Sequence, residues 1–279
     1  MEFLQVVILG IAQGITEFLP VSSSAHLVLI PYLLGWKHLG LSFDVALHAG
    51  TLIAIAMVFR GEWMLIVSGL WRWLKGERDD PSARLAFQIA VATVPAALVG
   101  ALLGHQIEQE LRNPTIIVFT TLGFGLLMGW ADQRGTQVRT LQDLGWRDVL
   151  FIGLFQALAL VPGVSRSGIT ITAAIFRRVD RASAARFSFL IGGPITAGAV
   201  LLQFVKLFQA WRGQVAEPDT LMTMGGFGVV LMIVGIITSA VVGFFCIRFL
   251  LVYLQQRTLR PFVWYRVALA VVLGAALWL

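Results

Sequence analysis

The sequence predicts an all-α integral membrane protein with about six transmembrane helices and two re-entrant helical hairpins related by an inverted repeat. Hydrophobic residues make up 58% of the 279 positions and charged residues only 13%, which is too little polar surface for a water-soluble protein of this length. Long uncharged runs alternate with short basic segments. Two further apolar segments are each interrupted by proline and small polar residues, and they can be aligned with each other.

Six nearly uncharged runs are long enough to cross the hydrocarbon core, given some tilt. They cover about 44–59, 85–104, 115–131, 187–205, 220–247 and 261–279. The two interrupted segments, 3–35 and 148–176, fit re-entrant hairpins better than single spans, because irregular backbone at membrane depth must be buried in protein or face water. The polar stretch 61–82 carries three tryptophans and is expected to form an amphipathic loop at the membrane interface.

The basic residues orient this topology. When the spans and hairpins are connected in order, 16 of the 21 Lys and Arg residues fall on one side and 4 on the other, which leaves Arg166 alone inside the membrane. The smaller group is Lys37, Arg112, Lys206 and Arg212. By the positive-inside rule the richer side is cytoplasmic, so both termini face outward. The hairpins then enter from opposite sides, which makes 1–131 and 148–279 inverted repeats of a single membrane domain, linked by a cytoplasmic loop at 132–147.

Composition also excludes several kinds of function. Net charge is +6, but the basic residues lie between apolar runs and report topology, so we expect no nucleic-acid partner. Cys246 is the only cysteine, which excludes an intrachain disulfide and suggests a packing role. The first apolar run lacks the basic flank and cleavage pattern of a signal peptide. Glycines such as Gly100 and Gly104 are expected to let helices pack closely.

The first interrupted segment places a carboxylate, three hydroxyls and an imidazole in apolar surroundings. Gln13 and Glu17 are four residues apart on one helix face, where an amide oxygen and a carboxylate suit a hard divalent cation. In a purely structural alternative, Glu17 pairs with a buried cation and the serines only cap a helix. Because such groups are costly in lipid, we favour a functional site. The residues that follow the break at Pro20 are Ser22, Ser23, Ser24 and His26.

The second interrupted segment aligns with the first. Pro162 and Gly163 break it, and a new half-helix then opens with Ser165, Arg166, Ser167 and Gly168. Amides without intrahelical acceptors, two hydroxyls and a guanidinium together form an anion site suited to phosphate. The alternative is that Arg166 is only the counter-ion of Glu17 across the repeat interface, and both roles can hold at different steps. We expect the two breaks to face each other around one cavity near the bilayer midplane.

These motifs resemble the bacterial undecaprenyl-diphosphate phosphatase family, also called the bacitracin-resistance family, over essentially the whole chain. They comprise Gln13 and Glu17 in a Gln/Glu-x-x-x-Glu pattern, the Phe-Leu-Pro-Val-Ser-Ser that follows, His26, Phe-Asp-Val-Ala-Leu-His at 43–48 and Pro-Gly-Val-Ser-Arg-Ser-Gly at 162–168. The resemblance implies hydrolysis of undecaprenyl diphosphate to the monophosphate and inorganic phosphate. This reaction recycles the lipid carrier of peptidoglycan synthesis at the outer face of the bacterial cytoplasmic membrane and confers bacitracin resistance.

The resemblance also implies roles for individual residues. A divalent metal ion, Mg²⁺ or Ca²⁺, would be held by Glu17 and Gln13 against the phosphates, while Arg166 would stabilise charge on the transferring group. Ser23 would be the nucleophile and His26 its general base or acid, with direct attack by water left open. Substrate contacts are expected from Arg166, Ser22, Ser165, Ser167, Gly163 and Gly168. Asp44 and His48 share a helix face and are expected to form a structural pair.

One alternative belongs to a different class of protein. A secondary transporter or flippase of polyprenyl phosphate would also use inverted repeats with broken helices near the midplane. A transporter predicts binding without bond cleavage, so phosphate release by purified protein in detergent separates the two. The expected partners are the polyprenyl diphosphate lipid and membrane lipids, with a homodimer left open.

Overall fold

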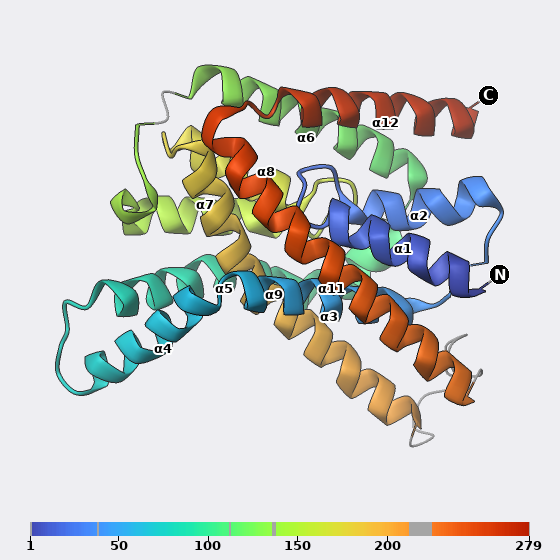
Figure 1. Ribbon diagram of the computed structural model, residues 1–279. Coiled ribbons are helices and arrows are strands. Elements are labelled where there is room, and N and C mark those ends of the chain that lie inside the picture. Colours follow the sequence, from blue (N-terminus) through green and yellow to red (C-terminus); the bar gives the residue numbers. More distant parts are fainter. Residues whose placement is uncertain (1, 38, 112, 136–137, 212–224, 279) are drawn as a thin grey trace.

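A computed structural model describes the whole chain except residues 1, 38, 112, 136–137, 212–224 and 279. Its described residues form eleven α-helices, one 3-10 turn at Leu141–Asp143 and one isolated bridge, without a strand (Figure 1). This arrangement confirms the predicted all-α class. Two of the basic residues used for topology, Arg112 and Arg212, lie outside the described residues, as does the start of the span predicted at 220–247.

Five helices are long and apolar enough to cross a membrane. They belong to α5 (Pro81–Glu110), α6 (Pro114–Arg134), α9 (Arg181–Trp211), α11 (Gly225–Gln256) and α12 (Arg260–Trp278). Local sequence fixes where α5 and α6 begin, because each has a proline in its first turn and a side-chain cap from Asp80 or Asn113 that accepts backbone N–H groups. These five helices confirm the corresponding predicted spans.

The sixth predicted span corresponds to α3 (Leu41–Val58), and it is not followed by a loop. A second helix, α4 (Arg60–Leu74), begins immediately and is bent by 74° from α3. The expectation of an amphipathic loop at 61–82 was therefore wrong in its secondary structure, because the apolar positions of this stretch recur with helical spacing. Exposed apolar side chains such as Met64, Val67 and Trp71 lie on α4.

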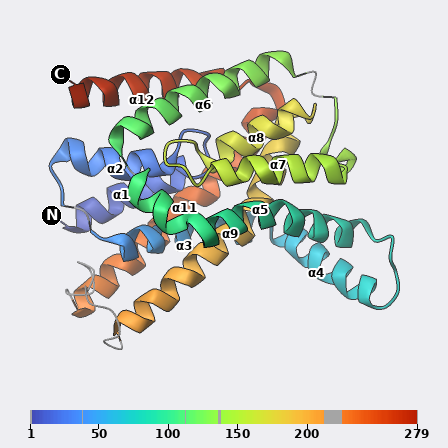
Figure 2. The same ribbon diagram turned by 180° about the vertical axis from the view of Figure 1, so that it is seen from behind.

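Both interrupted segments form pairs of short helices. The first pair is α1 (Glu2–Thr16) and α2 (Ser23–Leu34), with 15 and 12 residues, and the second is α7 (Trp146–Leu158) and α8 (Arg166–Phe176), with 13 and 11 residues. All four are shorter than the roughly 20 residues that a crossing needs, as re-entrant hairpins require. Both ribbon views place the two connecting breaks together in the middle of the molecule (Figures 1 and 2).

The buried core surrounds the second hairpin. Residues 167–175 of α8 are all buried, and they lie among α6, α7 and α9. By contrast, the surface of the bundle carries many large apolar side chains, including Leu98, Phe119, Leu201 and Phe245. An apolar exterior around a partly polar interior is typical of a protein whose solvent is lipid.

Close helix contacts use glycines other than Gly100 and Gly104. Gly104 has open space where a Cβ would lie, and Gly100 meets only Leu160 at 3.7 Å, so neither position brings helices together. Gly14 of α1 and Gly50 of α3 instead lie against α11, where a Cβ would come within 2.9 Å and 2.4 Å of backbone oxygens. These small residues permit the extensive packing of α1 and α3 on α11.

The charge analysis needs one correction. Arg266, which was counted with the cytoplasmic group, has no exposed surface and lies in the interior of the bundle. Fifteen of the 16 residues remain in that group, so the asymmetry persists. Arg166 is consequently not the only basic residue inside the bundle, and sequence position alone missed this because Arg266 lies only six residues from the start of α12.

Candidate active site

The two breaks are built in the same way, as their alignment predicted. Ser22 and Ser165 both adopt positive φ, 75° and 71°, and each immediately precedes a new helix. This conformation is costly for a residue with a side chain, and such strain tends to occur at functional sites. In each break the serine hydroxyl also meets the hydroxyl two residues later, at 3.1 Å for Ser24 and 3.3 Å for Ser167.

Direct hydrogen bonds join the two breaks across the middle of the fold. The Gly163 amide donates to Ser24 Oγ at 3.4 Å, and Ser167 Oγ donates to the Leu19 carbonyl at 3.2 Å. Residues more than 130 positions apart in the sequence therefore share one polar centre. The expectation that the breaks face each other is confirmed.

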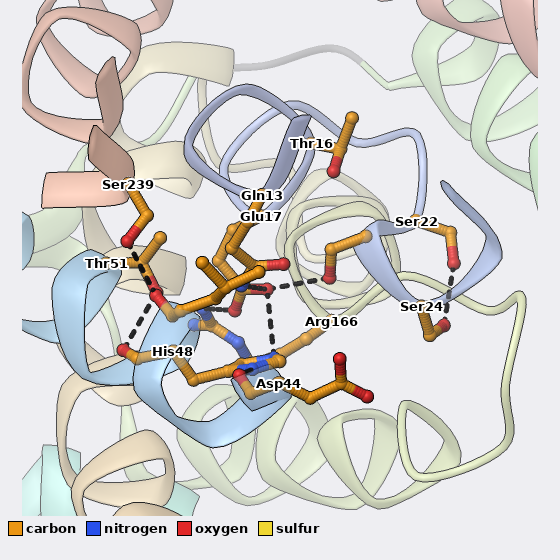
Figure 3. A network of polar contacts seen from close by, with 12 residues as sticks. Gln13, Thr16, Glu17, Ser22, Ser24, Asp44, His48, Thr51, Arg166 and Ser239 are labelled. Carbon is orange, nitrogen blue, oxygen red and sulfur yellow. Dashed lines mark hydrogen bonds and ion pairs between the residues drawn. The ribbon is translucent and has the colours of Figure 1, made fainter. Parts of the chain in front are cut away.

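Glu17 lies at this centre and is almost fully buried. Its Oε1 accepts a hydrogen bond from Arg166 Nη2 at 2.9 Å, which forms an ion pair between the two hairpins. Its Oε2 accepts from Ser23 Oγ at 2.7 Å and from Gln13 Nε2 at 3.2 Å. Figure 3 shows Glu17 together with Gln13, His48 and Arg166. One carboxylate thus meets the predicted nucleophile, the predicted anion-binding guanidinium and the predicted second metal ligand.

Gln13 has one side-chain atom without a partner. Its Nε2 is used by Glu17, while its Oε1 is buried and has no hydrogen-bond partner among the described residues. An orphaned buried oxygen is costly, and a cation beside it would satisfy it. The donor set therefore fits the predicted divalent metal ion, although the described residues contain no cluster of three His, Cys, Asp or Glu side chains that could hold a metal by themselves.

Arg166 is positioned from α9 as well as by Glu17. Its Nη1 donates to the Ser188 carbonyl at 3.3 Å, and the guanidinium lies directly over Gly192. A Cβ at position 192 would come within 1.4 Å of Nη1, so only glycine leaves room for the arginine there. Sequence reasoning missed Gly192, because a glycine inside an apolar helix gives no local signal of what lies above it.

His26 has other partners than the one predicted for it. Its Nδ1 is 2.7 Å from the Ser22 carbonyl, and its Nε2 is 2.5 Å from the hydroxyl of Tyr265 on α12. A carbonyl can only accept, so Nδ1 carries the proton and Nε2 accepts from the phenol. Both ring nitrogens are used away from Ser23, whose hydroxyl is bonded to Glu17. The proposed pairing of Ser23 with His26 would require a rotation of this ring.

The imidazole beside the carboxylate is instead His48. Its Nε2 lies 3.7 Å from Glu17 Oε2, a distance at which a protonated ring would form an ion pair. Its Nδ1 is anchored 2.7 Å from the backbone carbonyl of Asp44. This contact with Asp44 is thus to its backbone carbonyl and not the side-chain pair that the shared helix face predicted, and His48 also belongs to the site. The Phe-Asp-Val-Ala-Leu-His motif at 43–48 indicated that His48 matters. The sequence did not show its nearness to Glu17, because the two residues belong to different helical segments.

A cavity of about 200 Å³ adjoins the polar centre. Its polar lining comes from Ser24, Asp44 and His48, and Pro162 contributes from the second break. The rest of the lining is apolar and includes Leu27, Val28, Val45, Ile117, Ala199 and Val200. A space with apolar walls and a polar part that includes His48, the neighbour of Glu17, suits an amphiphilic ligand.

The remaining residues of the second motif have structural bonds in this conformation. Ser165 Oγ accepts from the Gly168 amide at 3.2 Å and caps α8, whereas the expected serine cap of the first break is not formed by Ser22, whose side chain makes no cap bond to α2. Ser167 is fully buried, and its hydroxyl is bonded to the Leu19 carbonyl of the first break. Gly163 has φ of 90°, and a Cβ there would lie 2.1 Å from Thr120 Oγ1. The glycines are thus explained by backbone and packing, while the predicted substrate contacts of these four residues stay predictions.

Arg266 is a second residue of this polar centre that the sequence did not reveal. Among the described residues, its partners are five backbone carbonyls and no carboxylate. Two of them belong to α6 at Thr120 and Thr121, at 3.4 and 3.0 Å. The others belong to the breaks themselves, and their donor–acceptor distances are 3.4 Å for Pro20, 2.8 Å for Gly163 and 3.0 Å for Val164. A single guanidinium therefore holds both breaks to α6 and α12.

Comparisons with known proteins identify the family of this chain. Residues 6–272 match the family described as Bacitracin resistance protein BacA. The chain is 44% identical over 276 residues to "Undecaprenyl-diphosphatase 2" of Stutzerimonas stutzeri, covering 98% of this chain and 97% of the relative. It is also 46% identical over 267 residues to "Undecaprenyl-diphosphatase" of Geobacter metallireducens, covering 95% of both. A relative with the same name from Pelotomaculum thermopropionicum is 44% identical over 278 residues, covering 99% and 98%.

Proposed function

Because the chain belongs to the bacitracin resistance protein BacA family, we propose that it is a membrane hydrolase that converts undecaprenyl diphosphate to undecaprenyl phosphate and inorganic phosphate. The relatives described above are named undecaprenyl-diphosphatases, and this chain aligns with nearly their whole length. They do not favour the alternative of a transporter or flippase. The apolar spans make it a multi-pass membrane protein, as the substrate requires.

The observation that carries this proposal is the double contact of Glu17. A buried carboxylate accepts from Ser23 at 2.7 Å through one oxygen and from Arg166 at 2.9 Å through the other. Hydrolysis of a phosphoric anhydride needs a nucleophile, an acceptor for its proton and a cation that stabilises the negative charge on the oxygens of the transferring phosphoryl group. These three functions meet here within hydrogen-bonding distance.

In the proposed mechanism the Ser23 hydroxyl attacks the terminal phosphorus while its proton passes to Glu17. The bond from that phosphorus to the bridging oxygen breaks, and undecaprenyl phosphate leaves. Water then hydrolyses the phosphoserine, which releases inorganic phosphate and restores the hydroxyl. In the alternative route a water held by Ser23 and Glu17 attacks directly. Trapping of a phosphoserine after rapid acid quench would separate the two.

Arg166 would exchange its partner during this cycle. Without substrate its guanidinium neutralises Glu17, and with substrate it has further N–H donors for the oxygens of the terminal phosphate. Both interpretations of Arg166 are therefore combined as successive states. Ser22, Ser165, Ser167, Gly163 and Gly168 keep their proposed place around the phosphates. His26 keeps its proposed role in proton transfer only if its ring leaves Tyr265.

We further propose that Glu17 and Gln13 Oε1 hold Mg²⁺ or Ca²⁺. Two protein oxygens are few for such ions, which commonly complete their coordination with water and substrate phosphates. When bound, the ion would neutralise the diphosphate and polarise its oxygens. The unpartnered Gln13 oxygen supports this assignment, and binding of Mn²⁺ detected by electron paramagnetic resonance in the wild type but not in Glu17→Gln would test it.

The charge asymmetry supports a cytoplasmic membrane location with the site open to the outer face, where the lipid carrier is recycled. The inverted relation of the two halves and a homodimer also remain proposals. The experiment that tests the function is phosphate release from undecaprenyl diphosphate by purified protein in detergent. A transporter would bind the lipid without releasing phosphate, since no gradient exists in detergent. Binding without turnover would reject the hydrolase.

A further inference from the structure

A second cavity lies on the side of the molecule that carries most of the basic residues. Its lining contains none of the candidate catalytic residues. Its volume is about 760 Å³, and it is enclosed by α4, α5, the segment around the 3-10 turn, and α9. Its charged and polar lining includes Glu62, Ser82, Arg84, Gln88, Ser183 and Arg186. We call it the α5–α9 cavity. None of these residues takes part in the site described above.

The position of the α5–α9 cavity relative to the membrane follows from its walls. The apolar spans of α5 and α9 begin at Pro81 and Arg181, within a few residues of the lining side chains. A cavity at the ends of two spans lies at the depth of the lipid phosphates. Basic pockets between transmembrane helices at this level are suited to anionic head groups.

The charges of the lining favour an anion. Arg84 and Arg186 are both exposed, and Glu62 is the only carboxylate of the lining. Arg186 forms an ion pair with Glu62. Arg84 donates one N–H to the Leu144 carbonyl at 3.2 Å and has four further N–H donors. Hydroxyl and amide side chains from Ser82, Ser183 and Gln142 add uncharged donors around the arginines.

The neighbouring surface of α4 distinguishes a lipid from a soluble anion. The residue after Glu62 is Trp63, which belongs to an apolar groove of about 660 Å³ on α4. The groove is also lined by Met64, Val67, Leu70, Trp71 and Leu74. A polar cavity and an apolar groove that include consecutive residues of α4 match the two parts of a phospholipid, and tryptophan is favoured at such an interface.

We propose that the α5–α9 cavity binds the phosphate of an anionic phospholipid through Arg84 and Arg186, with the acyl chains along the apolar groove of α4. This site goes beyond the proposed hydrolase activity and does not depend on it. Its ligand is a bilayer lipid that stabilises the protein and is not consumed. Glu62 limits the affinity, because it holds one of the two arginines.

Thermal unfolding of the purified protein in an uncharged detergent, followed by tryptophan fluorescence, tests this proposal. Dioleoylphosphatidylglycerol should raise the Tm at concentrations where dioleoylphosphatidylcholine and inorganic phosphate do not, because a ligand bound only by the folded state stabilises it. An equal rise with phosphatidylcholine, or with phosphate alone, would overturn the lipid assignment. Phosphate release is measured separately and does not enter this comparison.

Three variants make the test specific. Arg84→Gln should raise the phosphatidylglycerol concentration for half the Tm shift about tenfold, since one charge-assisted contact is lost. In Arg84→Gln the Leu144 carbonyl still accepts a hydrogen bond from Gln88 at 2.8 Å, so no backbone acceptor is left without a partner.

Glu62→Gln should lower the phosphatidylglycerol concentration for half the Tm shift, because it frees Arg186. The control Arg257→Gln, an exposed basic residue outside the cavity, should match the wild type. Equal responses of Arg84→Gln and Arg257→Gln, or weaker binding in Glu62→Gln, would overturn the site.

Discussion

At the scale of single residues, the site depends on a carboxylate that has to serve several partners. Glu17 is bonded to Ser23, Gln13 and Arg166 at once. A buried ion pair of this kind is costly to assemble, and removing one partner leaves the other charge uncompensated. The geometry therefore predicts different outcomes for substitutions that keep the charge of Arg166 and for those that remove it.

Arg166→Lys should reduce phosphate release by about a hundredfold, because an ammonium cannot reproduce the planar set of donors. Yield and elution profile of the purified protein report folding. If Arg166 served only as a counter-ion, the lysine variant would stay active, and Glu17→Gln would partly restore the yield of Arg166→Ala. An active lysine variant therefore removes the phosphate clamp from the mechanism.

Gly192→Ala should inactivate the enzyme by displacing Arg166, although residue 192 itself has no proposed contact with the substrate. The new Cβ would occupy the place of Arg166 Nη1, at 1.4 Å, and a displacement of about 1 Å can reduce turnover about a hundredfold. The matched control is Gly198→Ala on the same helix, where a Cβ meets nothing within 4 Å. Phosphate release from both variants decides the matter, and equal activities would contradict the positioning role of Gly192.

At the scale of elements, the main question is what holds two broken helices in register. Each break has an unusual serine backbone, and apart from the Glu17–Arg166 ion pair the direct bonds described between the breaks are long, at 3.2 and 3.4 Å. The rigid guanidinium of Arg266 donates hydrogen bonds to three backbone carbonyls of the breaks and to two of α6. Its five N–H groups are matched by five acceptors, which explains how a charge without a carboxylate is tolerated in the interior.

Arg266→Lys should therefore lower kcat by about tenfold or more, because an ammonium has only three donors and leaves break carbonyls unsatisfied. Arg260→Lys, at an exposed position of the same helix, should change little. The Lys variant should keep its affinity for Mn²⁺, since Gln13 and Glu17 lie on the same hairpin. Loss of kcat together with loss of folded protein would assign Arg266 to stability alone.

The start of α7 gives a prediction for pH. Asp148 is buried, which by itself raises its pKa, but hydrogen bonds from Arg139 and Arg177 outweigh this and lower the pKa to about 2. A depressed pKa stabilises the folded protein above the ordinary value of 3.8 and loses that effect as pH falls towards 2. Thermal unfolding between pH 5 and pH 2, as rough limits, should show less acid sensitivity in Asp148→Asn than in the wild type. The control is Asp79→Asn, at an exposed position.

At the scale of the whole molecule, the charge asymmetry predicts that the 132–147 loop faces the cytoplasm and that the C-terminal end of α5 faces outward. In a Cys246→Ala background, Val138→Cys should be shielded from an impermeant thiol reagent in intact cells, and Glu110→Cys should react. Both side chains are exposed, so access depends on the membrane and not on burial. Ready labelling at position 138 with none at 110 would invert the orientation.

Much of this architecture was predictable because lipid imposes strict rules on sequence. Spans must be long and apolar, and polar breaks inside them are expensive, so the spans of α5, α6, α9, α11 and α12 and both hairpins could be located in advance. The stretch after α3 has tryptophans and charges typical of an interfacial loop, but its apolar positions also recur with helical spacing, and the structure shows a helix there. Spacing also predicted the Gln13–Glu17 pair, which the structure shows hydrogen-bonded.

By itself, then, the sequence determined the membrane class, the two hairpins and the groups that carry the chemistry, because these depend on local composition and spacing. The tertiary structure alone decided the partners. It bonded Ser23 to Glu17, His26 to Tyr265 and Arg166 against Gly192, and it placed Arg266 among the carbonyls of both breaks. Such pairings join residues up to 246 positions apart. They follow from how helices pack in three dimensions, for which no local pattern in a single chain gives a signal.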